Sequence, residues 1–429
     1  MEEMIPKQAT RRRRRRRSHN NTARNSDSDA AGMIMNLPRD IIYEILSRLP
    51  IESVLRCMSV CKFWSTFLYD SYFIDLHFTK SMMHHRPPTL VLTTSLLPPI
   101  DNKMSSQLMV SAEEGEGGDW RKATHIPIGD FELVKGEVID IVGSCNGFLC
   151  IAPRIGLGLG LGLVRICLHN PTTRETMKLP KSHLFIPPKN SSTKIQNSVG
   201  FGIGSLSKKY KVIVVYELFG YDWSKIIRYS EIITVGESSW RKLDFPTLSY
   251  DQLLTDPVLL DGTLYRLIVI DDDYYNQYVL ALDIDSEKFW TIDCCPLPIR
   301  RESIRRRYLV PMDGSLALID NYACTNPWRM DIWLLEGSKT MGFSFTLTTY
   351  DMSELVCWGN FFTVMGKHSH DTFLLNVSRV EDGNPTMKSS VILYSPTKKQ
   401  QYFCVQGELY ESDLFLKSWM VPSLKSLSL

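Results

Sequence analysis

Three short stretches near the start of the chain carry apolar residues at helical spacing, one, three or four positions apart. The first stripe consists of Ile41, Ile42, Ile45, Leu46 and Leu49. The second consists of Ile51, Val54, Leu55 and Met58, and the third of Phe63, Trp64, Phe67 and Leu68. Pro38 and Pro50 bound the first stripe, because proline suits the start of a helix and interrupts its interior. The pattern predicts three short helices, the first with its stripe on one side.

Three helices of this size cannot cover all of their own apolar surface. Residues 37–69 hold 19 apolar positions out of 33, and units shorter than about 40 residues rarely support a core alone. Part of this surface must be covered by something else. That cover is either another part of the same chain, with the helices as an ordinary cap on it, or a partner protein.

From about residue 80 the periodicity changes to short runs rich in Val, Ile, Tyr and Leu, separated by turn residues. The predicted strands are 89–93, 138–142, 148–151, 164–168, 211–216, 226–235, 264–270, 278–284, 316–319, 331–335 and 391–394. Long helical stretches are missing between them. The pattern predicts a mostly all-β region.

The β region also repeats itself at a period near 50 residues. Gly262 and Gly314 stand in the phrases DGTL and DGSL, 52 residues apart, and Leu282 and Leu334 have the same separation. Trp240 and Trp290 begin a third phrase, in which a proline follows within about eight residues. Multi-stranded repeats of this length resemble kelch-type propeller blades. We therefore expect an α+β multidomain chain, with a three-helix module followed by a kelch-like β-propeller of six or seven blades.

The net charge of +2 is distributed unevenly along the chain. Residues 1–32 hold nine Lys and Arg, including the run Arg11–Arg17, against four Asp and Glu. With little to bury, this segment is expected to be a disordered basic tail. It is interpreted either as a nuclear localisation signal or as a solvated tail. Dedicated nucleic-acid binding is not expected, because the remaining chain has no basic face or base-stacking motif.

Candidate chemistry is sparse. The glycine ladder within residues 155–164 lacks the Lys-Ser/Thr of a phosphate loop, and Asp271–Asp273 lack the partners of a calcium loop. Cys57 and Cys61, like Cys294 and Cys295, do not have zinc or redox spacing, so we interpret them as buried reduced thiols. We predict no catalytic residues, no metal, no cofactor and no membrane segment. The expected location is the nucleus, the cytoplasm or both.

The helical segment resembles a known family. Leu37-Pro38, Asp40-Ile41, Glu44-Ile45-Leu46, Arg48-Leu49-Pro50 and Val60-Cys61-Lys62-x-Trp64 are similar, in type and spacing, to the F-box. F-box modules dock onto the Skp-family adaptor of cullin-based ubiquitin ligases. The chain departs from the pattern at Cys57-Met58, where plant members often carry an aromatic residue and an arginine.

The β region resembles the F-box-associated domain of the large plant F-box family. The similar phrases are SCNGFLCI, HNPTTRETMKLP, VGFGIGSLSKKYKVIVVY, SSWRKLDFP and DGTLYRL. The glycine-rich segment 155–164 and the acidic loop 271–278 depart from it. The resemblance implies an F-box module at 33–79 and an interaction domain at 80–429, after the tail at 1–32.

The expected function follows from that resemblance. The protein would be the substrate-recognition subunit of a Skp/cullin/F-box ubiquitin ligase, reaching a cullin and a RING subunit through the adaptor and holding an unidentified target protein. Ten residues are predicted to contact the adaptor, although some would form the module's core instead: Leu37, Pro38, Ile41, Ile45, Leu49, Pro50, Leu55, Val60, Cys61 and Trp64. No target-binding residue is predicted. The alternatives are a kelch-type oxidase or epimerase, and a nucleic-acid-binding protein using the arginine run.

Overall fold

A computed structural model describes most of the chain from residue 37 onward. The described residues are 37–83, 89–94, 107–110, 123–126, 137–155, 165–182, 194–219, 226–246, 250–253, 257–270, 277–293, 305–322, 329–338, 342–353, 355, 360–369, 371–380, 387–405 and 414–420. The chain separates into two compact units, Met1–His84 and His85–Leu429. We call the described part of the first the helical unit and that of the second the β domain. The predicted tail, glycine ladder, Asp271–Asp273 and Cys294–Cys295 lie outside the described residues.

The helical unit contains one helix more than the sequence pattern predicted. Its elements are α2 (Arg39–Leu46), α3 (Ile51–Met58), α4 (Lys62–Ser65), the 3₁₀ turn η1 (Thr66–Tyr69) and α5 (Ser71–Met83). Pro38 and Pro50 directly precede α2 and α3, as their fixed backbone angle favours. The added helix α5 continues four residues beyond the expected boundary at residue 79.

The residues of the first apolar stripe that lie in α2 share one side of the helix, within about 140° of its circumference, but only two of them are buried. Ile42 and Leu46 are buried, whereas Ile41 and Ile45 are exposed. Neighbouring residues are about 100° apart around a helix, so two rows, each four residues apart, can face different surroundings. The helix also ends at Leu46, which leaves Leu49 in the turn before α3. The row of Ile42 and Leu46 joins a core whose other buried members include Val54, Met58, Phe67 and Phe73.

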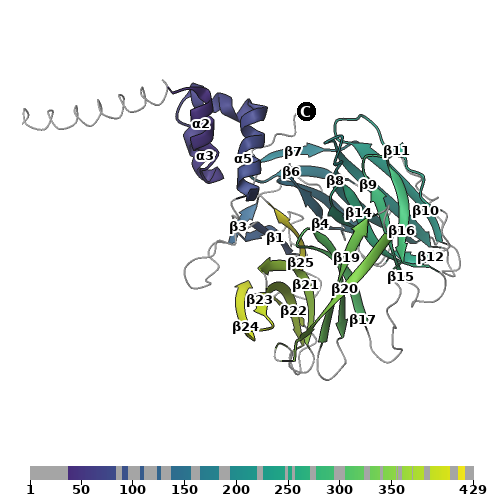
Figure 1. Ribbon diagram of the computed structural model, residues 1–429. Coiled ribbons are helices and arrows are strands. Elements are labelled where there is room, and N and C mark those ends of the chain that lie inside the picture. The colour runs from purple at the N-terminus through teal and green to yellow at the C-terminus, as the bar shows by residue number, and fades with distance from the viewer. Residues whose placement is uncertain are drawn as a thin grey trace, which may run out of the picture. The chain divides into compact units, whose positions relative to one another are not determined.

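The described part of the β domain contains six antiparallel sheets, five of which use strands consecutive in sequence. Their strands are β4 (Glu137–Cys145), β5 (Phe148–Ile155), β6 (Cys167–Asn170) and β7 (Glu175–Lys178); β8 (Lys194–Ile203), β9 (Tyr210–Phe219), β10 (Ile226–Thr234) and β11 (Arg241–Lys242); β12 (Tyr250–Leu253), β13 (Val258–Leu260), β14 (Thr263–Ile270), β15 (Gln277–Asp283) and β16 (Lys288–Asp293); β17 (Arg305–Met312), β18 (Ser315–Tyr322), β19 (Arg329–Ser338) and β20 (Gly342–Asp351); and β21 (Asn360–Ser369), β22 (Thr372–Val380), β23 (Met387–Ser395) and β24 (Gln400–Val405). Figure 1 shows them as successive groups of arrows, coloured from teal to yellow in chain order.

The sixth sheet combines strands that are far apart in the chain. In it β1 (Thr89–Thr94) lies between β2 (Gln107–Val110) and β25 (Leu414–Met420), and β3 (Ala123–Ile126) follows β2. The expected all-β propeller class is confirmed. The expected number of repeats, six or seven, is higher than the number of sheets built from consecutive strands, of which five lie within the described residues. The remaining sheet is assembled from both ends of the domain.

Apolar side chains fill the spaces between successive sheets. One cluster lies between the β4–β7 and β8–β11 sheets, and three more occupy the following spaces up to the β21–β24 sheet. Strand β14 shows the cause, because alternate residues face opposite sides of a strand. Leu264 and Ile268 join the cluster toward the β8–β11 sheet, and Leu267 joins the one toward the β17–β20 sheet. A strand covered on both faces therefore reads as a continuous apolar run.

The predicted 52-residue period corresponds to equivalent positions in successive sheets. Asp261-Gly262 joins β13 to β14, and Asp313-Gly314 joins β17 to β18. All four residues have positive φ, which is 46° at Asp261, 75° at Gly262, 51° at Asp313 and 74° at Gly314. Two-residue hairpins favour Asp-Gly because its backbone twist then matches that of the strands. Each phrase therefore marks the first hairpin of a repeat.

Candidate functional site

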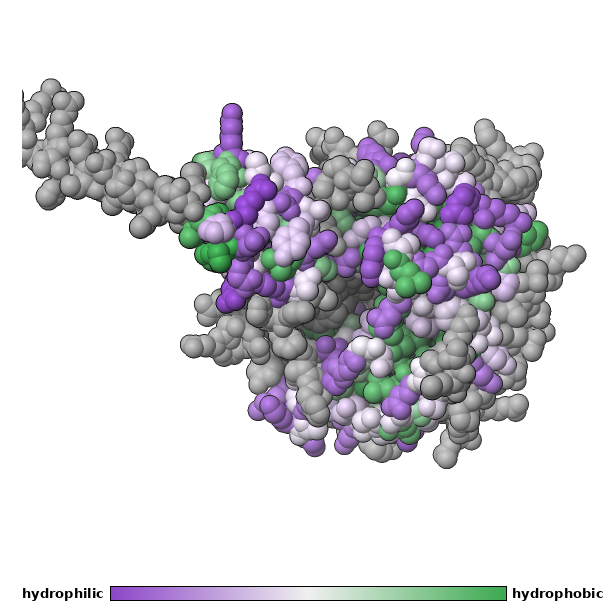
Figure 2. All heavy atoms as spheres, turned by 45° about the horizontal axis from the view of Figure 1, so that its top comes forward, coloured by the Kyte–Doolittle hydropathy of each residue, from purple (hydrophilic) through white to green (hydrophobic). Residues whose placement is uncertain are grey.

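The ten residues predicted for adaptor contact share one property in the helical unit: none of them is fully buried. Leu37, Pro38, Ile41, Ile45, Pro50 and Val60 are exposed, and Leu49, Leu55, Cys61 and Trp64 are half-buried. The exposed fraction reaches 50% for Ile45 and 77% for Val60. The core is made of other apolar residues. Figure 2 shows hydrophobic surface, in green, on the part of this unit that it displays.

The clearest contrast lies along α2, where two rows of apolar residues run side by side. Ile41 is 48% exposed and Ile45 is 50% exposed, whereas Ile42 and Leu46 are each 2% exposed. Side chains four residues apart on a helix lie next to each other. Ile41 and Ile45 therefore form an apolar row that the helical unit itself does not cover. We call these two residues the α2 outer row.

Polar contacts hold α2 against α5, and so fix this row in place. The Tyr43 hydroxyl donates a hydrogen bond to the Asp70 carboxylate, which also accepts the Phe73 N–H at 3.2 Å. Burial raises the pKa of Tyr43 to about 12, and the hydrogen bond to Asp70 acts in the same direction. That hydrogen bond in turn lowers the pKa of Asp70. Because the pKa of Tyr43 is raised and that of Asp70 is lowered, the hydroxyl stays protonated and the carboxylate stays ionised over the whole pH range between the two values.

A second polar contact on the same helix uses Glu44. Its carboxylate pairs with Lys80 of α5 and with Arg48, whose Nε lies 3.0 Å away. The hydrogen bond from Lys80 is the largest cause of the lowered pKa of Glu44, and Arg48 is the next. These charges border the apolar row without covering it.

The thiols of the helical unit are less enclosed than expected. Cys57 and Cys61 are half-buried, which corrects the prediction that both are buried, while Cys145, Cys150 and Cys167 of the β domain are buried. Within the part of the chain that the structure describes, no three His, Cys, Asp or Glu side chains are grouped to hold a metal ion. The described helices include none long and apolar enough to cross a membrane.

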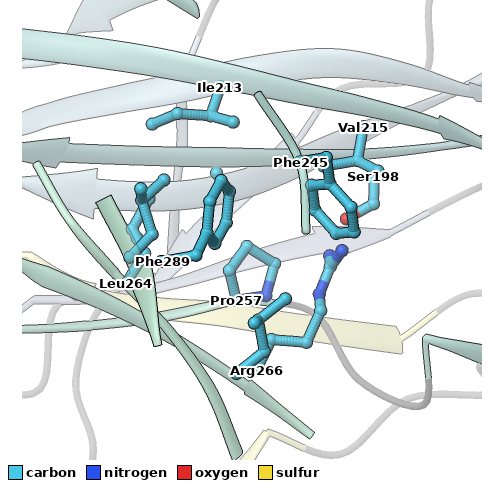
Figure 3. Close-up of a pocket in the computed structure, with 11 residues that line it drawn as sticks. Ser198, Ile213, Val215, Phe245, Pro257, Leu264, Arg266 and Phe289 are labelled. Carbon is cyan, nitrogen blue, oxygen red and sulfur yellow. The ribbon is translucent and has the colours of Figure 1, made fainter. Parts of the chain in front are cut away.

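The β domain carries a pocket that the sequence analysis did not predict. It lies between the β8–β11 and β12–β16 sheets and measures about 370 Å³ with its open mouth. Aromatic and aliphatic side chains, such as Phe245, Phe289 and Leu264, form most of the wall (Figure 3). Ser198 and Arg266 add polar groups to it.

A weak signal for this pocket was present in the sequence. Arg266 interrupts the otherwise apolar run of β14, and only 6% of its surface is exposed. Charged side chains are seldom buried without a specific reason. The signal could not be interpreted alone, because the other wall of the pocket comes from strands about 60 residues earlier in the chain.

The chain matches two protein-family models. Residues 34–75 match the F-box domain, and residues 128–406 match the F-box associated beta propeller domain. The second match covers more than half of the chain. It includes the five sheets of consecutive strands.

Related proteins of Arabidopsis thaliana are described as F-box proteins. The F-box protein At3g07870 of Arabidopsis thaliana is 26% identical over 353 residues, which cover 76% of each protein. The F-box protein At3g57590 of the same plant is 26% identical over 312 residues, covering 71% of this chain and 69% of that protein. Among solved structures, a polysaccharide lyase of family PL25, an ulvan lyase, has 10% identity and a TM-score of 0.40, covering 69% of this chain and 71% of its own. A TM-score this low supports no inference about activity. The matched models and the relatives together show that the chain belongs to the plant F-box proteins with an F-box-associated β-propeller domain.

Proposed function

We propose that this protein is the substrate-recognition subunit of a Skp/cullin/F-box ubiquitin ligase. The F-box module docks on a Skp-family adaptor, and through it reaches a cullin and a RING subunit. The β domain holds a target protein. Other subunits carry out ubiquitin transfer, so the chain contributes proximity rather than chemistry. Holding a target beside the conjugating machinery raises its effective concentration without any new catalytic group.

The observation that carries this proposal is the exposure of the α2 outer row. Ile41 and Ile45 remain about half exposed beside the fully covered Ile42 and Leu46. Apolar surface removed from water contributes roughly 25 cal/mol per Å². A partner that covers this row therefore gains binding free energy that the helical unit leaves unused. Membership in the F-box family supports a Skp-family adaptor as that partner.

The test introduces carboxylates into the outer row and measures adaptor binding. The double variant Ile41→Asp, Ile45→Asp is expected to weaken binding to a purified Skp-family adaptor at least 100-fold, about 2.7 kcal/mol. Both positions face water in the free unit, so the helical content should remain unchanged. The matched control is Leu206→Asp in the β domain, where Leu206 is 87% exposed. Unchanged affinity of the double variant, with normal helical content, would contradict the proposal.

A milder variant addresses the predicted start of the contact. Leu37 is 38% exposed and Pro38 directly precedes α2. Replacing both with Ala should reduce co-purification with the adaptor while leaving the unfolding transition of the β domain unchanged. Retention of full co-purification would remove Leu37 and Pro38 from the proposed contact.

The location and the basic tail remain separate proposals. We place the protein in the nucleus, the cytoplasm or both, with Arg11–Arg17 as the nuclear signal. Deleting residues 1–32 should then shift a fluorescently tagged protein toward the cytoplasm. Steeply salt-dependent RNA binding that is lost with the same deletion would favour the nucleic-acid alternative instead. The kelch-like character of the repeats stays a prediction.

A further inference from the structure

Strand β20 forms one edge of the β17–β20 sheet, and the described strands include none that pairs with its outer side. On its inner side β20 pairs with β19 residue for residue, from Gly342 opposite Ser338 to Asp351 opposite Arg329, without a register shift (Figure 1). Alternate residues of an edge strand direct their backbone N–H and C=O groups away from the sheet. These groups of β20 have no ladder partner among the described strands. A further β-strand is the occupant that such an edge accepts.

The corresponding edges of the other sheets of consecutive strands are shorter. Strands β7, β11 and β16 have four, two and six residues, and each of them carries Lys or Arg. Strand β24 has six residues, and its ladder to β23 contains a register shift. Strand β20 has ten residues, and its first nine, Gly342–Tyr350, include no Lys, Arg, Asp, Glu or Pro. Short strands, charges, prolines and irregular ladders keep sheet edges from pairing with other chains. This segment of β20 has none of these protections.

Strand β20 is held in place by its own sheet and its neighbours, yet it remains accessible. On one face Phe345 packs against the apolar cluster between the β12–β16 and β17–β20 sheets. On the other face the rings of Tyr350 and Phe373 meet edge to face, with centroids 5.1 Å apart. The side chains along the middle of the strand are exposed: Ser344, Thr346, Leu347 and Thr348. The edge is therefore a formed template that a second strand can reach.

The sequence of β20 is complementary to itself. Two antiparallel copies related by a two-fold axis at Thr346 place this residue opposite Thr346 of the second copy. The pairs on either side of the axis are Phe343 with Thr349, Ser344 with Thr348, and Phe345 with Leu347. Apolar side chains then share one face of the joined sheet and hydroxyls the other, because alternate residues of a strand face opposite sides. Aromatic–β-branched pairs and pairs of hydroxyl residues are favourable across strands, and no like charges meet along Gly342–Tyr350.

We propose that β20 is the interface of a homodimer, in which two copies of this chain join their β17–β20 sheets into one antiparallel sheet. A strand of unrelated sequence has to match this pattern of apolar and hydroxyl residues, whereas a second copy matches it by symmetry. An interface that uses the same strand of both chains closes at two copies and does not grow into a fibre. The interface is distinct from the α2 outer row, and the inference does not rest on the adaptor-binding proposal. Each dimer carries two helical units.

The first measurement follows the mass of the purified full chain by sedimentation velocity across a dilution series. A single strand ladder is a small interface, so we expect a Kd on the order of 10 μM. The protein should then be mostly dimer at about 200 μM and mostly monomer at about 1 μM. A monomer at every concentration would overturn the proposal, including the case in which β20 takes an extended segment of another protein instead. This measurement needs no variant.

A charge at the symmetry axis tests whether β20 is the interface. Thr346→Lys places two like charges opposite each other and should raise the Kd at least about tenfold. Thr346→Glu should do the same. An equal mixture of the two variants should restore the dimer, because Lys then meets Glu. Misfolded chains cannot give this rescue. An unchanged dimer in Thr346→Lys, or a mixture that stays monomeric, would overturn the proposal.

A matched pair of double variants tests the register. Ser344→Lys with Thr348→Lys sets like charges opposite each other twice and should abolish the dimer. Ser344→Lys with Thr348→Glu changes the same two exposed positions but sets opposite charges together, and its Kd should stay within about threefold of that of the unmodified protein. Equal loss of the dimer in both would overturn the proposal. Adaptor binding measured on the same samples should be unchanged, which separates this outcome from failure of the proposed function.

Discussion

The helical unit and the β domain cover their apolar side chains by different means. In the β domain, four clusters are each enclosed between two sheets of the same chain. In the helical unit one small core contains Val54, Phe67 and Phe73, while Ile41, Ile45 and Val60 stay in contact with water. Radial repetition gives each sheet neighbours to pack on, whereas the helices of the small unit leave one apolar row uncovered. A large domain can thus complete its own core, while a small module retains surface for a partner.

The largest expected effect lies in the small core. Phe67 is fully buried and contacts Tyr43, Phe63, Trp64 and Phe73 through its ring. Phe67→Ala should cost about 3–5 kcal/mol, comparable to the whole free energy of unfolding of a unit this small. Amide hydrogen exchange in residues 39–83 should lose its protection. Tyr69→Ala, at an 87% exposed position next to the same core, is the control and should change little. Preserved protection in Phe67→Ala would show that the unit is held together by something other than this core.

A buried ion pair tests the enclosure of the β domain. Arg307 and Asp320 are joined by two hydrogen bonds of 2.8 and 2.7 Å, with side chains 4% and 1% exposed. Asp320→Ala leaves the guanidinium in the interior without its carboxylate, which should cost about 3–5 kcal/mol in urea unfolding. Glu44→Gln in the helical unit removes the carboxylate that pairs with Lys80 and with the exposed Arg48, and it should cost clearly less than Asp320→Ala. Similar costs in the two variants would refute this difference between the units.

The pH dependence of the β domain should contain a contribution from Glu287. Its hydrogen bonds from Arg241, followed by those from Lys211, lower its pKa from 4.5 to about 2. Because the folded pKa is the lower one, this stabilisation is complete above pH 4.5 and is lost as the pH falls toward about 2. Solvent screening limits it to about 1–2 kcal/mol. Urea midpoints of Glu287→Gln measured between pH 5 and 2 should fall less steeply than those of the unmodified protein. Parallel curves would exclude the contribution.

The smallest expected effect compares the same turn in two repeats. Gly262 and Gly314 have φ of 75° and 74°, but a Cβ at Gly262 would lie 2.7 Å from the Ser205 backbone N, whereas one at Gly314 has nothing within 4 Å. Gly314→Ala should therefore cost about 1 kcal/mol, from backbone strain alone. Gly262→Ala should cost more, because it adds a steric clash. Equal denaturation midpoints for the two variants would show that the segment at Ser205 can shift away from the added Cβ without a cost in stability.

Local pattern predicted much of this fold and part of the candidate site. The Asp-Gly phrases marked equivalent hairpins, because that turn demands positive φ at both residues. Helix α5 was missed, since its apolar residues are spread around the helix and give no stripe. The sequence analysis also did not predict that Ile41 is exposed while Ile42 is buried. Periodicity identifies apolar rows but not which row packs against a neighbouring helix. The pocket at Arg266 could not be predicted from local pattern, because its walls come from two sheets that only folding brings together.

The pairing of β1 with β25 sets a constraint on how the domain is made. Residues 94 and 414 are joined across one ladder although 320 positions separate them. A ribosome adds about 5–20 residues per second, so β1 must wait roughly 15–60 seconds for its neighbour to be synthesised. During that interval one edge of the first sheet is unprotected, and edges of this kind attract other strands. Chaperone contact during translation should therefore concentrate on residues 89–94, and truncation within 414–420 should make that exposure permanent.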